Sequence, residues 1–590
     1  MTEYHAPLKD MRFALRELAG LDGVLELPAY ETIDSDTVDQ VLEGAGNFAR
    51  DILAPLNIPG DRAGVSVVDG QVQVPDGFSE AYQQFVANGW PSLSGSVAYD
   101  GMGFPHVVGL AAFEIWNSAN MAFALCPMLT GGATGAIAAH ASDDLKQKFL
   151  PKMISGEWSG TMVLSEPHAG SDLAAISTKA VREGDHYRLT GTKIFITWGD
   201  HQLTDNTVHL VLARLDDAPD GIRGISMFLV PKYLVNDDGS LGDRNDVYPA
   251  SVEHKLGIHA SPTCVMNFGE STGAIGYLVG EENRGMANMF TMMNQARLEV
   301  GVQGVSLSER AYQLARAYAR DRVQGLAPGK EGRVTIIHHA DVRRMLLLMK
   351  SQIEAMRGAS YNMCAEIDRL HHAVDAGDRE RAAIRVALLT PIIKGWLSET
   401  AQELTSLGIQ IHGGMGFVEE TGAAQHLRDA RILPIYEGTT GIQAADFVGR
   451  KILADEGRAM KALLDEMRAT LAACDSTPLE PVQTALAENI SELESGIDWL
   501  VTEAIKHPDL PGAAAANLLM AAGVAVGMWQ MARSAVAVSG GNDDYDKSFC
   551  ESKLYTATFY ARQVSPRVLM YVRAAMSGAE AVMGLDEELF

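Results

Sequence analysis

Residues 162–171 read MVLSEPHAGS and stand where a helix-like region of the chain gives way to strand-like segments. Glycine and small residues let backbone N–H groups approach a ligand closely, and the hydroxyls of Ser165 and Ser171 add hydrogen-bond donors. A plain turn between a strand and a loop has the same composition, and the segment alone favours that simpler interpretation. What surrounds it therefore decides the fold.

The residues before this segment are predicted to be helical, and those after it to form strands. Hydrophobic spacing in the first 155 or so residues lacks alternation, with candidate helices at 107–122 and 143–153. The second candidate begins with acidic residues, which suit a helix N-terminus. From about Ser159, runs rich in Val, Ile, Thr and aromatic residues predict antiparallel strands, at residues 160–165, 187–197, 207–215 and 225–230. The polar residues 236–246 are predicted to form a long loop.

After about Gly285 the helical period returns. It predicts helices at 300–323, 341–364 (with Asp341 as N-cap), 382–407 and 443–459, and further helices in 461–590 with an interruption at 474–480. The fold class is predicted as mainly α with a middle β domain. The predicted domains are an N-terminal helical domain (1–158), a β domain (159–284), a helical bundle (285–460) and a helical extension (461–590).

Composition excludes several classes of protein. A net charge of −27 over 590 residues disfavours nucleic-acid binding, because such a surface repels phosphate backbones. The five scattered cysteines favour neither a disulfide framework nor a metal site, and they are typical of buried thiols in a reducing compartment. The N-terminus lacks the pattern of a signal peptide, and no apolar run approaches the ~20 residues of a membrane span. We expect a cytoplasmic protein without membrane insertion.

Residues 191–198, GTKIFITW, form the second informative segment. Alternation along a strand would place Phe195 and Thr197 on the same face, so that an aromatic ring and a hydroxyl lie side by side. This pair suits a flat heteroaromatic cofactor. An aromatic residue in a strand is nevertheless more often part of a core.

Two later segments complete the set. Residues 410–416, QIHGGMG, form a glycine-rich turn after a helix, without the spacing or the preceding strand of a dinucleotide-binding βαβ unit. In residues 435–440, IYEGTT, Glu437 lies beside an apolar run. An apolar setting raises the pKa of a carboxyl group, which suits a general base. The alternative is an acidic residue at a helix N-terminus, next to a Thr cap.

In this order, the four segments resemble the acyl-CoA dehydrogenase family. The resemblance extends from about Tyr99 to Lys451 and includes KQKFLPKMISGEWSG (146–160), KLGIHASPT (255–263) and RDARILPIYEGT (428–439). Order, spacing and content over more than half of the chain are more specific than any single motif. The long N-terminal region and the C-terminal extension resemble the large subgroup that contains 3-methylthiopropionyl-CoA dehydrogenases.

The resemblance implies the acyl-CoA dehydrogenase fold: an N-terminal helical domain, a β-barrel-like domain and a four-helix bundle, with FAD between the last two and a helical extension added here. It implies FAD contacts from Met162, Leu164, Ser165, Ser171, Phe195, Thr197, Gln410, Gly413, Gly414 and Thr439, and from Arg322 to the FAD of a neighbouring subunit. It implies Glu437 as the catalytic base, and substrate contacts from Ser171, Asn294, Arg297 and Gly438. Without it, Arg297 and Arg322 would be interpreted as part of a solvated helix face.

Three positions depart from the family pattern. Phe195 stands where Trp is common, which keeps the stacking surface and loses the indole donor. Ser165 replaces a usual Thr and keeps the hydroxyl, and Gly441 stands where Gln is frequent. None of the three changes removes the implied chemistry.

The implied reaction converts an acyl-CoA to its trans-2-enoyl-CoA. Glu437 would take the α-proton as the β-hydride passes to flavin N5, with the thioester carbonyl bound by the Glu437 N–H and a ribityl hydroxyl. The expected substrate is a short acyl-CoA such as 3-methylthiopropionyl-CoA, the expected electron acceptor an electron-transfer flavoprotein, and the expected assembly a homodimer or homotetramer. Alternatives are an acyl-CoA oxidase, a long-chain dehydrogenase, and a nucleic-acid-binding or structural relative of the fold.

Overall fold

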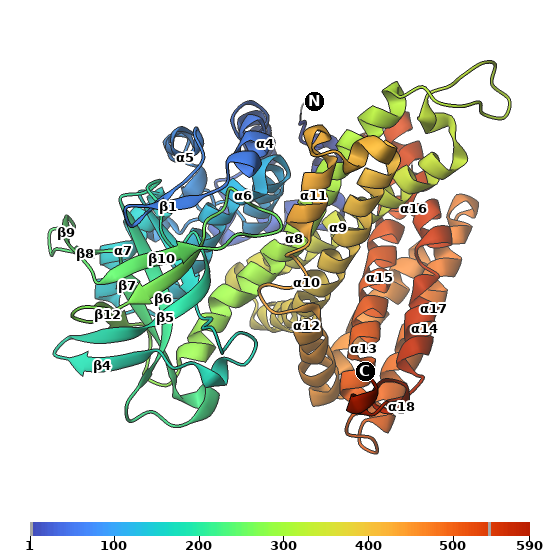
Figure 1. Cartoon of the computed structure of the whole chain (residues 1–590). Coiled ribbons are helices and arrows are strands. Elements are labelled where there is room, and N and C mark those ends of the chain that lie inside the picture. Colours follow the sequence, from blue (N-terminus) through green and yellow to red (C-terminus); the bar gives the residue numbers. More distant parts are fainter. Residues whose placement is uncertain (1–3, 541–543) are drawn as a thin grey trace. The chain divides into compact units, whose positions relative to one another are not determined.

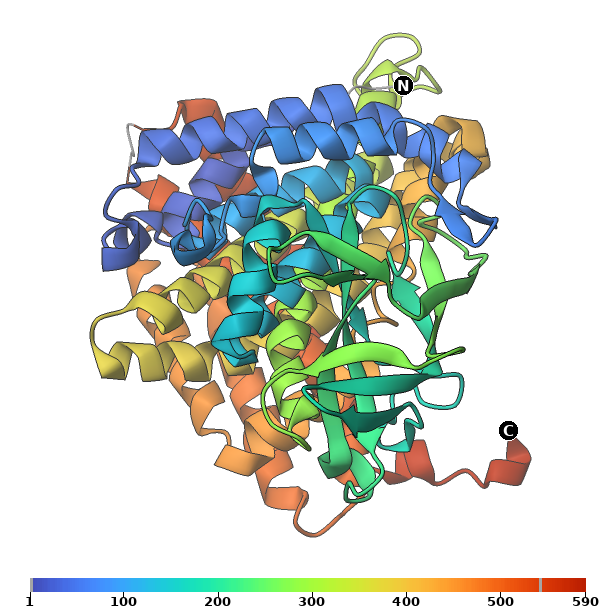
Figure 2. The same ribbon diagram turned by 90° about the vertical axis from the view of Figure 1, so that its left-hand side faces the viewer.

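The computed structural model describes residues 4–540 and 544–590, and ribbon views of it are given in Figures 1 and 2. The chain divides into two compact units. The bundle unit comprises Met1–Gly46, Pro105–Ser118 and Val300–Phe590, and the sheet unit comprises Asn47–Phe104 and Ala119–Glu299. Helices α6 (His106–His140) and α8 (Gly285–Asp321) each contribute residues to both units.

The sheet unit is built on an eight-stranded mixed sheet. Its strands run in the order β10-β11-β5-β12-β7-β6-β3, with β4 beside β5 and β6. They are β3 (Trp158–Val163), β4 (Lys179–Glu183), β5 (His186–Thr197), β6 (Asn206–Leu215), β7 (Ile225–Pro231), β10 (Val247–Val252), β11 (Thr263–Phe268) and β12 (Ala274–Leu278). The four predicted strands correspond to β3, β5, β6 and β7 within two residues, whereas the others were not predicted.

The prediction of a wholly antiparallel sheet is wrong. β3 pairs with β6 in parallel, from Trp158 opposite Asn206 to Val163 opposite Val211, and β4 also pairs in parallel with the end of β6. Parallel neighbours need a long connection. Residues 164–205 provide it, because β4 and β5 lie between the two parallel strands in the sequence.

Two short hairpins replace segments that were predicted otherwise. The expected loop at 236–246 contains strand β9 (Leu241–Arg244), which pairs with β8 (Tyr233–Val235). A second hairpin, β1 (Ser66–Val68) and β2 (Gln71–Gln73), interrupts the region predicted to be helical. Its turn residues Asp69 and Gly70 have φ values of 52° and 73°. Both are left-handed, as a type I′ hairpin turn requires, and Asp-Gly is a strong short sequence signal for such a turn.

Helices cover the sheet unit's remaining core. The candidate at 107–122 is the first part of α6, which continues to His140 after a non-helical residue, Asn120. The candidate at 143–153 is α7 (Asp143–Ser155), and its N-cap hydroxyl, Ser142, accepts a hydrogen bond from a backbone N–H. The Phe149 ring of α7 packs 5.8 Å from the Trp158 ring of β3. Helices α4 (Ala54–Ala63) and α5 (Phe78–Ala87) also belong to this unit.

Long helices form the bundle unit. The spans predicted at 341–364 and 382–407 lie within α9 (Ala340–His372) and α10 (Ala376–His412), and the span predicted at 300–323 follows α8 to its last residue, Asp321, and extends two residues beyond it. Asp341 was predicted as the N-cap of α9, but His339 holds that position and Asp341 lies in the first turn, 2.8 Å from Arg344. Shorter helices complete this part: α1 (Leu8–Phe13), α2 (Leu21–Leu25), α3 (Ser35–Phe48) and α11 (Ala423–Ala430).

A buried guanidinium joins three helices of this unit. Arg357 of α9 donates to Glu114 Oε1 of α6 at 2.6 and 2.8 Å and to Glu309 Oε2 of α8 at 3.0 Å. The other Glu114 oxygen accepts from the Tyr361 hydroxyl at 2.7 Å. Burial alone would lower the pKa of Arg357, but the two carboxylates raise it well above its ordinary value. The guanidinium therefore stays charged and neutralises one of the two negative charges, those of Glu114 and Glu309, that are buried with it.

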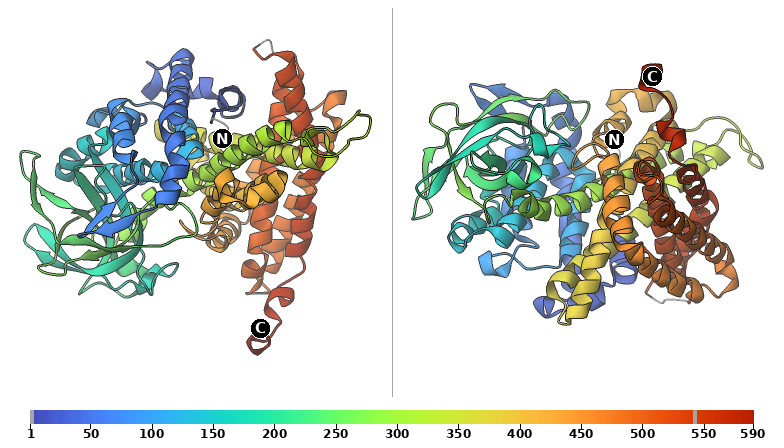
Figure 3. Two further views of the ribbon diagram at one scale, coloured as in Figure 1. Left: turned by 45° about the horizontal axis from the view of Figure 1, so that its top comes forward. Right: turned by 90° about the horizontal axis from the view of Figure 1, so that it is seen from below.

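The C-terminal extension is helical, as predicted. It contains α13 (Arg458–Ala473), α14 (Glu480–Glu503), α15 (Leu510–Ser539), α16 (Lys547–Gln563), α17 (Arg567–Ala575) and α18 (Glu580–Met583), and α14, α15 and α17 lie side by side (Figure 3). The predicted interruption at 474–480 is present between α13 and α14. The helix predicted at 443–459 is broken instead, because Glu456 and Gly457 adopt left-handed backbone conformations before α13 begins.

In the part of the chain that the structure describes, two helices are long and apolar enough to span a membrane, so the expectation that no apolar run approaches this length is wrong. They are α6 and α15, with mean hydropathies of 1.4 and 1.6 in their most apolar windows. Those windows are 72% and 67% buried inside the protein. Their hydrophobicity is therefore accounted for by packing inside the protein, and the Leu129 and Ile137 side chains of α6 share a core with strands β3 and β6.

All five cysteines are free thiols, and four of them are buried. Within residues 4–540 and 544–590, no group of three or more His, Cys, Asp or Glu side chains is arranged to hold a metal ion.

Candidate active site

The loop that follows β3 is fastened to β5 by a buried ion pair. The Nζ atom of Lys193 in β5 lies 2.9 Å from Glu166 Oε1 and 2.9 Å from the carbonyl oxygen of Leu164. The Glu166 carboxylate also accepts hydrogen bonds from the backbone N–H and hydroxyl groups of Ser177 and Thr178, at 2.6 to 3.0 Å. Both ends of this loop are therefore fixed to the sheet.

The charge of Glu166 is stabilised by these neighbours. Burial alone would raise the pKa of Glu166, but the Lys193 ammonium and the hydrogen bonds from Thr178 and Ser177 lower it to about 2. The carboxylate is thus ionised at neutral pH although its side chain is only 2% exposed.

The predicted flavin contacts of this region lie along the fastened loop. Met162 is part-buried in β3, Leu164 and Ser165 are half-buried, and Ser171 is exposed. The carbonyl of Ser165 accepts a hydrogen bond from the Ile194 N–H at 3.0 Å. The loop therefore begins directly beside the part of β5 that carries Phe195.

Strand β5 contains a bulge at Phe195. Strand β11 pairs Cys264 with Ile196 and Met266 with Lys193, so two residues of β5 oppose one of β11. Phe195 has a φ of 60° and its side chain is 61% exposed. A non-glycine residue in the left-handed region costs on the order of 1–3 kcal/mol, and such residues cluster at ligand-binding sites. The bulge presents a large aromatic face while its neighbour Ile196 stays buried.

Thr197 and Trp198 close β5. Thr197 is half-buried, and the exposure of Phe195 and Thr197 on either side of buried Ile196 agrees with the predicted common face, although the bulge interrupts simple alternation. Trp198 also has a positive φ, 51°, and its indole N–H donates to the Ala122 carbonyl at 3.1 Å. The strand end is thereby anchored to α6 within the sheet unit.

The two predicted substrate contacts on α8 differ in environment. Asn294 is exposed, whereas Arg297 is 4% exposed, with its guanidinium 5.8 Å from the Phe290 ring. Arg297 Nη1 donates to Asn294 Oδ1 at 3.3 Å. The interpretation of Arg297 as part of a solvated helix face is therefore wrong, since its side chain is buried.

In the bundle unit, the predicted base Glu437 lies in the loop that leads to α12 (Thr440–Asp446). Glu437 and Gly438 have φ values of 55° and 89°, so a left-handed turn precedes the helix. The Thr439 hydroxyl caps α12 by accepting from the Ile442 N–H at 3.2 Å. An acidic residue beside a Thr cap is thus a correct description of the local backbone. A cap does not require a left-handed glutamate, which is sterically unfavourable.

Helix α10 and helix α12 hold this turn from two sides. Lys394 of α10 is fully buried, and its Nζ donates to the carbonyl oxygens of Leu433 at 2.9 Å and Gly438 at 2.6 Å. The Gln443 amide of α12 lies 3.3 and 3.4 Å from the carbonyl oxygens of Glu437 and Gly438. The carbonyls around the predicted base therefore have defined directions.

Tyr436, which directly precedes Glu437, is fixed by its side chain. Its hydroxyl hydrogen-bonds Gln303 Oε1 of α8. Burial raises the pKa of Tyr436 well above its ordinary value, and the charge of Glu437 raises it further. The phenol therefore remains a proton-bearing donor throughout the physiological range.

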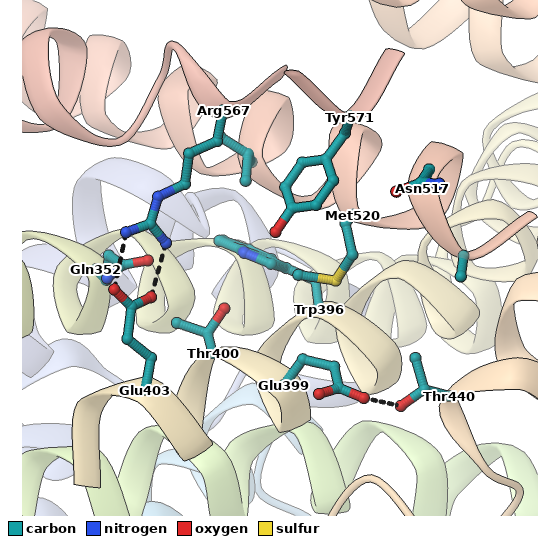
Figure 4. Close-up of a pocket in the computed structure, with 12 residues that line it drawn as sticks. Gln352, Trp396, Glu399, Thr400, Glu403, Thr440, Asn517, Met520, Arg567 and Tyr571 are labelled. Carbon is teal, nitrogen blue, oxygen red and sulfur yellow. Dashed lines mark hydrogen bonds and ion pairs between the residues drawn. The ribbon is translucent and has the colours of Figure 1, made fainter. Parts of the chain in front are cut away.

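Helix α10 also faces the C-terminal extension across a cleft of about 320 Å³ (Figure 4). At one end Glu399 accepts from the Thr440 hydroxyl at 2.6 Å, directly after the turn of Glu437. At the other end Arg567 of α17 makes a bidentate pair with Glu403, at 2.6 and 2.8 Å. Tyr571 points into the cleft toward Trp396 (Figure 4). The extension thus covers the helix that supports the Glu437 turn.

Four further predicted cofactor contacts lie on the bundle unit, away from the Glu437 turn: Gln410, Gly413, Gly414 and Arg322. Gln410 lies in the last turn of α10, and the exposed Gly413 and Gly414 follow it. The exposed Arg322 follows α8 at the same end, where the Tyr318 and His412 rings are 4.5 Å apart. Lys394 and Gln410 are sixteen residues apart on α10, which corresponds to about 24 Å along the axis. One chain therefore does not bring this group next to the Glu437 turn.

Comparison with known proteins identifies the family. Three family profiles cover most of the chain: acyl-CoA dehydrogenase N-terminal domain (36–157), middle domain (161–270) and C-terminal domain (283–453). The chain belongs to the acyl-CoA dehydrogenase family. It is therefore an oxidoreductase acting on acyl-CoA thioesters with FAD as cofactor. Residues 463–586 match a further profile, acetyl-CoA dehydrogenase C-terminal like.

The similarity to individual relatives extends over nearly the whole chain. The 3-methylmercaptopropionyl-CoA dehydrogenase of Ruegeria pomeroyi is 45% identical over 95% of this chain and 96% of its own length. A butyryl-CoA dehydrogenase of Syntrophomonas wolfei is 35% identical over 100% of this chain and 99% of its own. The Bacillus anthracis acyl-CoA dehydrogenase solved with FAD has a similar fold, with a TM-score of 0.74 and 19% identity over 96% of this chain and 92% of that one.

The residues of this acyl-CoA dehydrogenase fit a flavin in two respects. The Phe195 ring is exposed on a strained bulge, and a flat cofactor would cover it. The loop beside it is fixed by the Glu166–Lys193 pair and presents hydroxyl and backbone groups of the kind that bind polar parts of a cofactor.

Sequence reasoning missed the residues that support these contacts. Lys193, Glu166 and Lys394 were not singled out. A signal was present for Lys394, because it interrupts the apolar run 388–397, where a lysine must find buried acceptors. No comparable pattern marked Glu166, whose partners become neighbours only in the folded sheet.

The Glu166–Lys193 pair predicts a defined pH dependence of stability. The pKa of Glu166 falls from its ordinary 4.5 to about 2 on folding. Its contribution is therefore fully present above pH 4.5 and is lost as the pH falls toward 2. The difference in unfolding free energy between wild type and Glu166→Gln should shrink by about 1.4 kcal/mol for each pH unit in that window. Urea unfolding at pH 7, 5, 4 and 3 measures it, and a difference that stays constant contradicts the assignment.

Proposed function

We propose that this enzyme desaturates a short acyl-CoA between Cα and Cβ, with Glu437 as the base that removes the α-proton. The observation that carries the proposal is the left-handed turn at Glu437, held by Lys394 and Gln443 although no helix cap needs it. A strained residue whose neighbours are fixed is typical of a catalytic group.

The protein's own residues position the substrate and remove its α-proton. The Glu437 carboxylate accepts the α-proton, and the Glu437 N–H serves as a donor to the thioester carbonyl, where negative charge develops. Bound FAD supplies the acceptor for the hydride that leaves Cβ. The cofactor would be held by Met162, Leu164, Ser165, Ser171, Phe195, Thr197 and Thr439. The substrate would be held by Ser171, Asn294, Arg297 and Gly438.

Replacing Glu437 tests the assignment of the base. Glu437→Gln keeps the shape of the side chain and removes its basicity, so FAD content and acyl-CoA binding should stay as in wild type. Bleaching of the flavin by butyryl-CoA should slow by about 10²–10⁴-fold, as expected for a lost general base. Anaerobic stopped-flow absorbance at saturating substrate measures the rate. Bleaching at the wild-type rate would place the base elsewhere.

The preferred substrate is proposed to be 3-methylthiopropionyl-CoA or a thioester of similar length. The 45% identity to the Ruegeria enzyme over nearly the whole of both chains supports this choice, and the similarity to a butyryl-CoA dehydrogenase favours the same chain length. A thioether sulfur at the γ position occupies roughly the volume of a methylene group. Substrates that differ by one methylene differ by about 1–3 kcal/mol in an apolar pocket, which predicts modest selectivity.

A panel of thioesters tests the chain length. The expected order of kcat/KM is 3-methylthiopropionyl-, butyryl- and valeryl-CoA close together, and palmitoyl-CoA well below them. The measurement uses an artificial electron acceptor, so that acceptor preference does not enter. Palmitoyl-CoA outperforming butyryl- and valeryl-CoA would overturn the short-chain assignment and leave the dehydrogenase activity intact.

An electron-transfer flavoprotein is proposed as the electron acceptor, since the chain is similar to dehydrogenases over its full length. The alternative is an oxidase, which passes electrons to oxygen. Stoichiometric hydrogen peroxide during aerobic turnover would favour that alternative.

We also propose that the enzyme is a homo-oligomer, a dimer or a tetramer. Gln410, Gly413, Gly414 and Arg322 lie about 24 Å along α10 from the supports of Glu437, so they would serve the cofactor of a second copy. Arg322→Ala should then lower FAD retention without changing the fold of the chain. Sedimentation equilibrium that finds only 63.5 kDa particles in the FAD-loaded enzyme contradicts the proposal.

A further inference from the structure

Lys394 is a fully buried cation in the middle of α10. Its neighbours in the sequence, from Leu388 to Leu397, are almost all apolar and buried. Taking an ammonium out of water costs several kcal/mol unless its hydrogen bonds are replaced. For packing alone, an unbranched apolar side chain such as Met would be the more stable choice at this position.

The acceptors of Lys394 lie on both sides of the proposed base. Its Nζ contacts the carbonyl oxygen of Leu433, four residues before Glu437, and that of Gly438, one residue after it. A single charged group therefore closes the loop across Glu437. Charge-assisted hydrogen bonds are roughly twice as strong as neutral ones, which suits a clamp.

The closed loop fixes the backbone of Glu437 itself. The Gly438 carbonyl is held by Lys394, the Glu437 carbonyl by Gln443, and the Tyr436 side chain by Gln303. The Thr440 N–H donates to the Pro434 carbonyl at 3.0 Å and closes the same loop a second time. These contacts oppose relaxation of the left-handed φ of Glu437, which is sterically unfavourable for a non-glycine residue.

We propose that Lys394 is a positioning residue for the reaction: its ammonium holds the Glu437 turn so that the carboxylate and the N–H of Glu437 both face the substrate. This inference rests on the proposed role of Glu437. Lys394 acts through the backbone carbonyls of Leu433 and Gly438, on either side of Glu437. Its loss should therefore lower the rate of proton removal while binding of acyl-CoA and FAD is retained.

Lys394→Met, which keeps the length of the side chain and removes the charge, tests this. In the FAD-loaded enzyme, reduction of the flavin by saturating butyryl-CoA should slow by about 100-fold, the effect expected when a catalytic group is misplaced by about 1 Å. The half-saturating butyryl-CoA concentration and the FAD content should stay at their wild-type values. An unchanged rate of reduction, or a loss expressed only in the half-saturating concentration, overturns the proposal.

Lys553→Met is the matched control. Lys553 is 3% exposed, lies in α16 of the same unit and pairs with Asp10 and Glu354, none of which is part of the proposed machinery. It should lower stability, because it removes the buried cation that Asp10 and Glu354 share, although Glu354 keeps its pair with Lys350. Flavin reduction in the folded enzyme should be unchanged. A loss in Lys553→Met equal to that in Lys394→Met would show a general effect of buried lysines and overturn the specific role.

A double variant separates this proposal from the proposed function. If Lys394 acts through Glu437, Lys394→Met should slow the residual reaction of Glu437→Gln by less than about twofold, because coupled residues are not additive. A full 100-fold further loss would place the action of Lys394 elsewhere. If the Glu437→Gln enzyme reduced its flavin at the wild-type rate, the assignment of Glu437 as the base would be refuted, whatever the rate of Lys394→Met.

Lys394→Arg keeps the proposal testable if Lys394→Met does not fold. It retains a buried charge, but its planar fork cannot present the same donor to both carbonyls. Flavin reduction should then fall by about tenfold or more at unchanged FAD content. A wild-type rate in the folded Lys394→Arg enzyme counts against the clamp.

Discussion

The bundle unit depends on one buried ionic contact, that of Arg357 with Glu114 and Glu309. It connects α6, α8 and α9, and α9 packs along α10. Breaking such a contact leaves an uncompensated charge in the interior and costs about 3–5 kcal/mol, a large share of the stability of a protein. The helix that carries Arg357 therefore packs against the helix whose Lys394 supports the Glu437 turn.

In each unit a buried lysine likewise connects separate segments of the chain, but it holds a single loop and not several helices. In the sheet unit Lys193 holds the loop after β3 through Glu166 and the Leu164 carbonyl. In the bundle unit Lys394 holds the Glu437 loop through two carbonyls. An ammonium has three donors on a flexible stem, so it can join backbone groups that no regular hydrogen-bond ladder connects.

The sequence predicted the elements whose signals are local and missed those that depend on distant pairing. The long helices and the strands β5, β6 and β7 follow from hydrophobic period, whereas the parallel pairing of β3 with β6 requires the fold. Phe195 and Glu437 are predicted as site residues because their flanking motifs resemble a family. Glu166 and Lys394 act through residues that are distant in sequence, 27 and 44 positions apart at the farthest, so no short motif contains them with their partners.

Phe195 and Glu437 share a constraint that explains why these supports exist. Each has a left-handed backbone, with φ of 60° and 55°, at a position where glycine would carry no strain. Glycine would, however, remove the aromatic face in one case and the carboxylate in the other. The proposed roles require these two side chains, so the strain has to be balanced by contacts nearby: the bulge with β11 at Phe195, and Lys394 with Gln443 at Glu437. The stability of the surrounding helices and sheet is thus what keeps two strained residues in place.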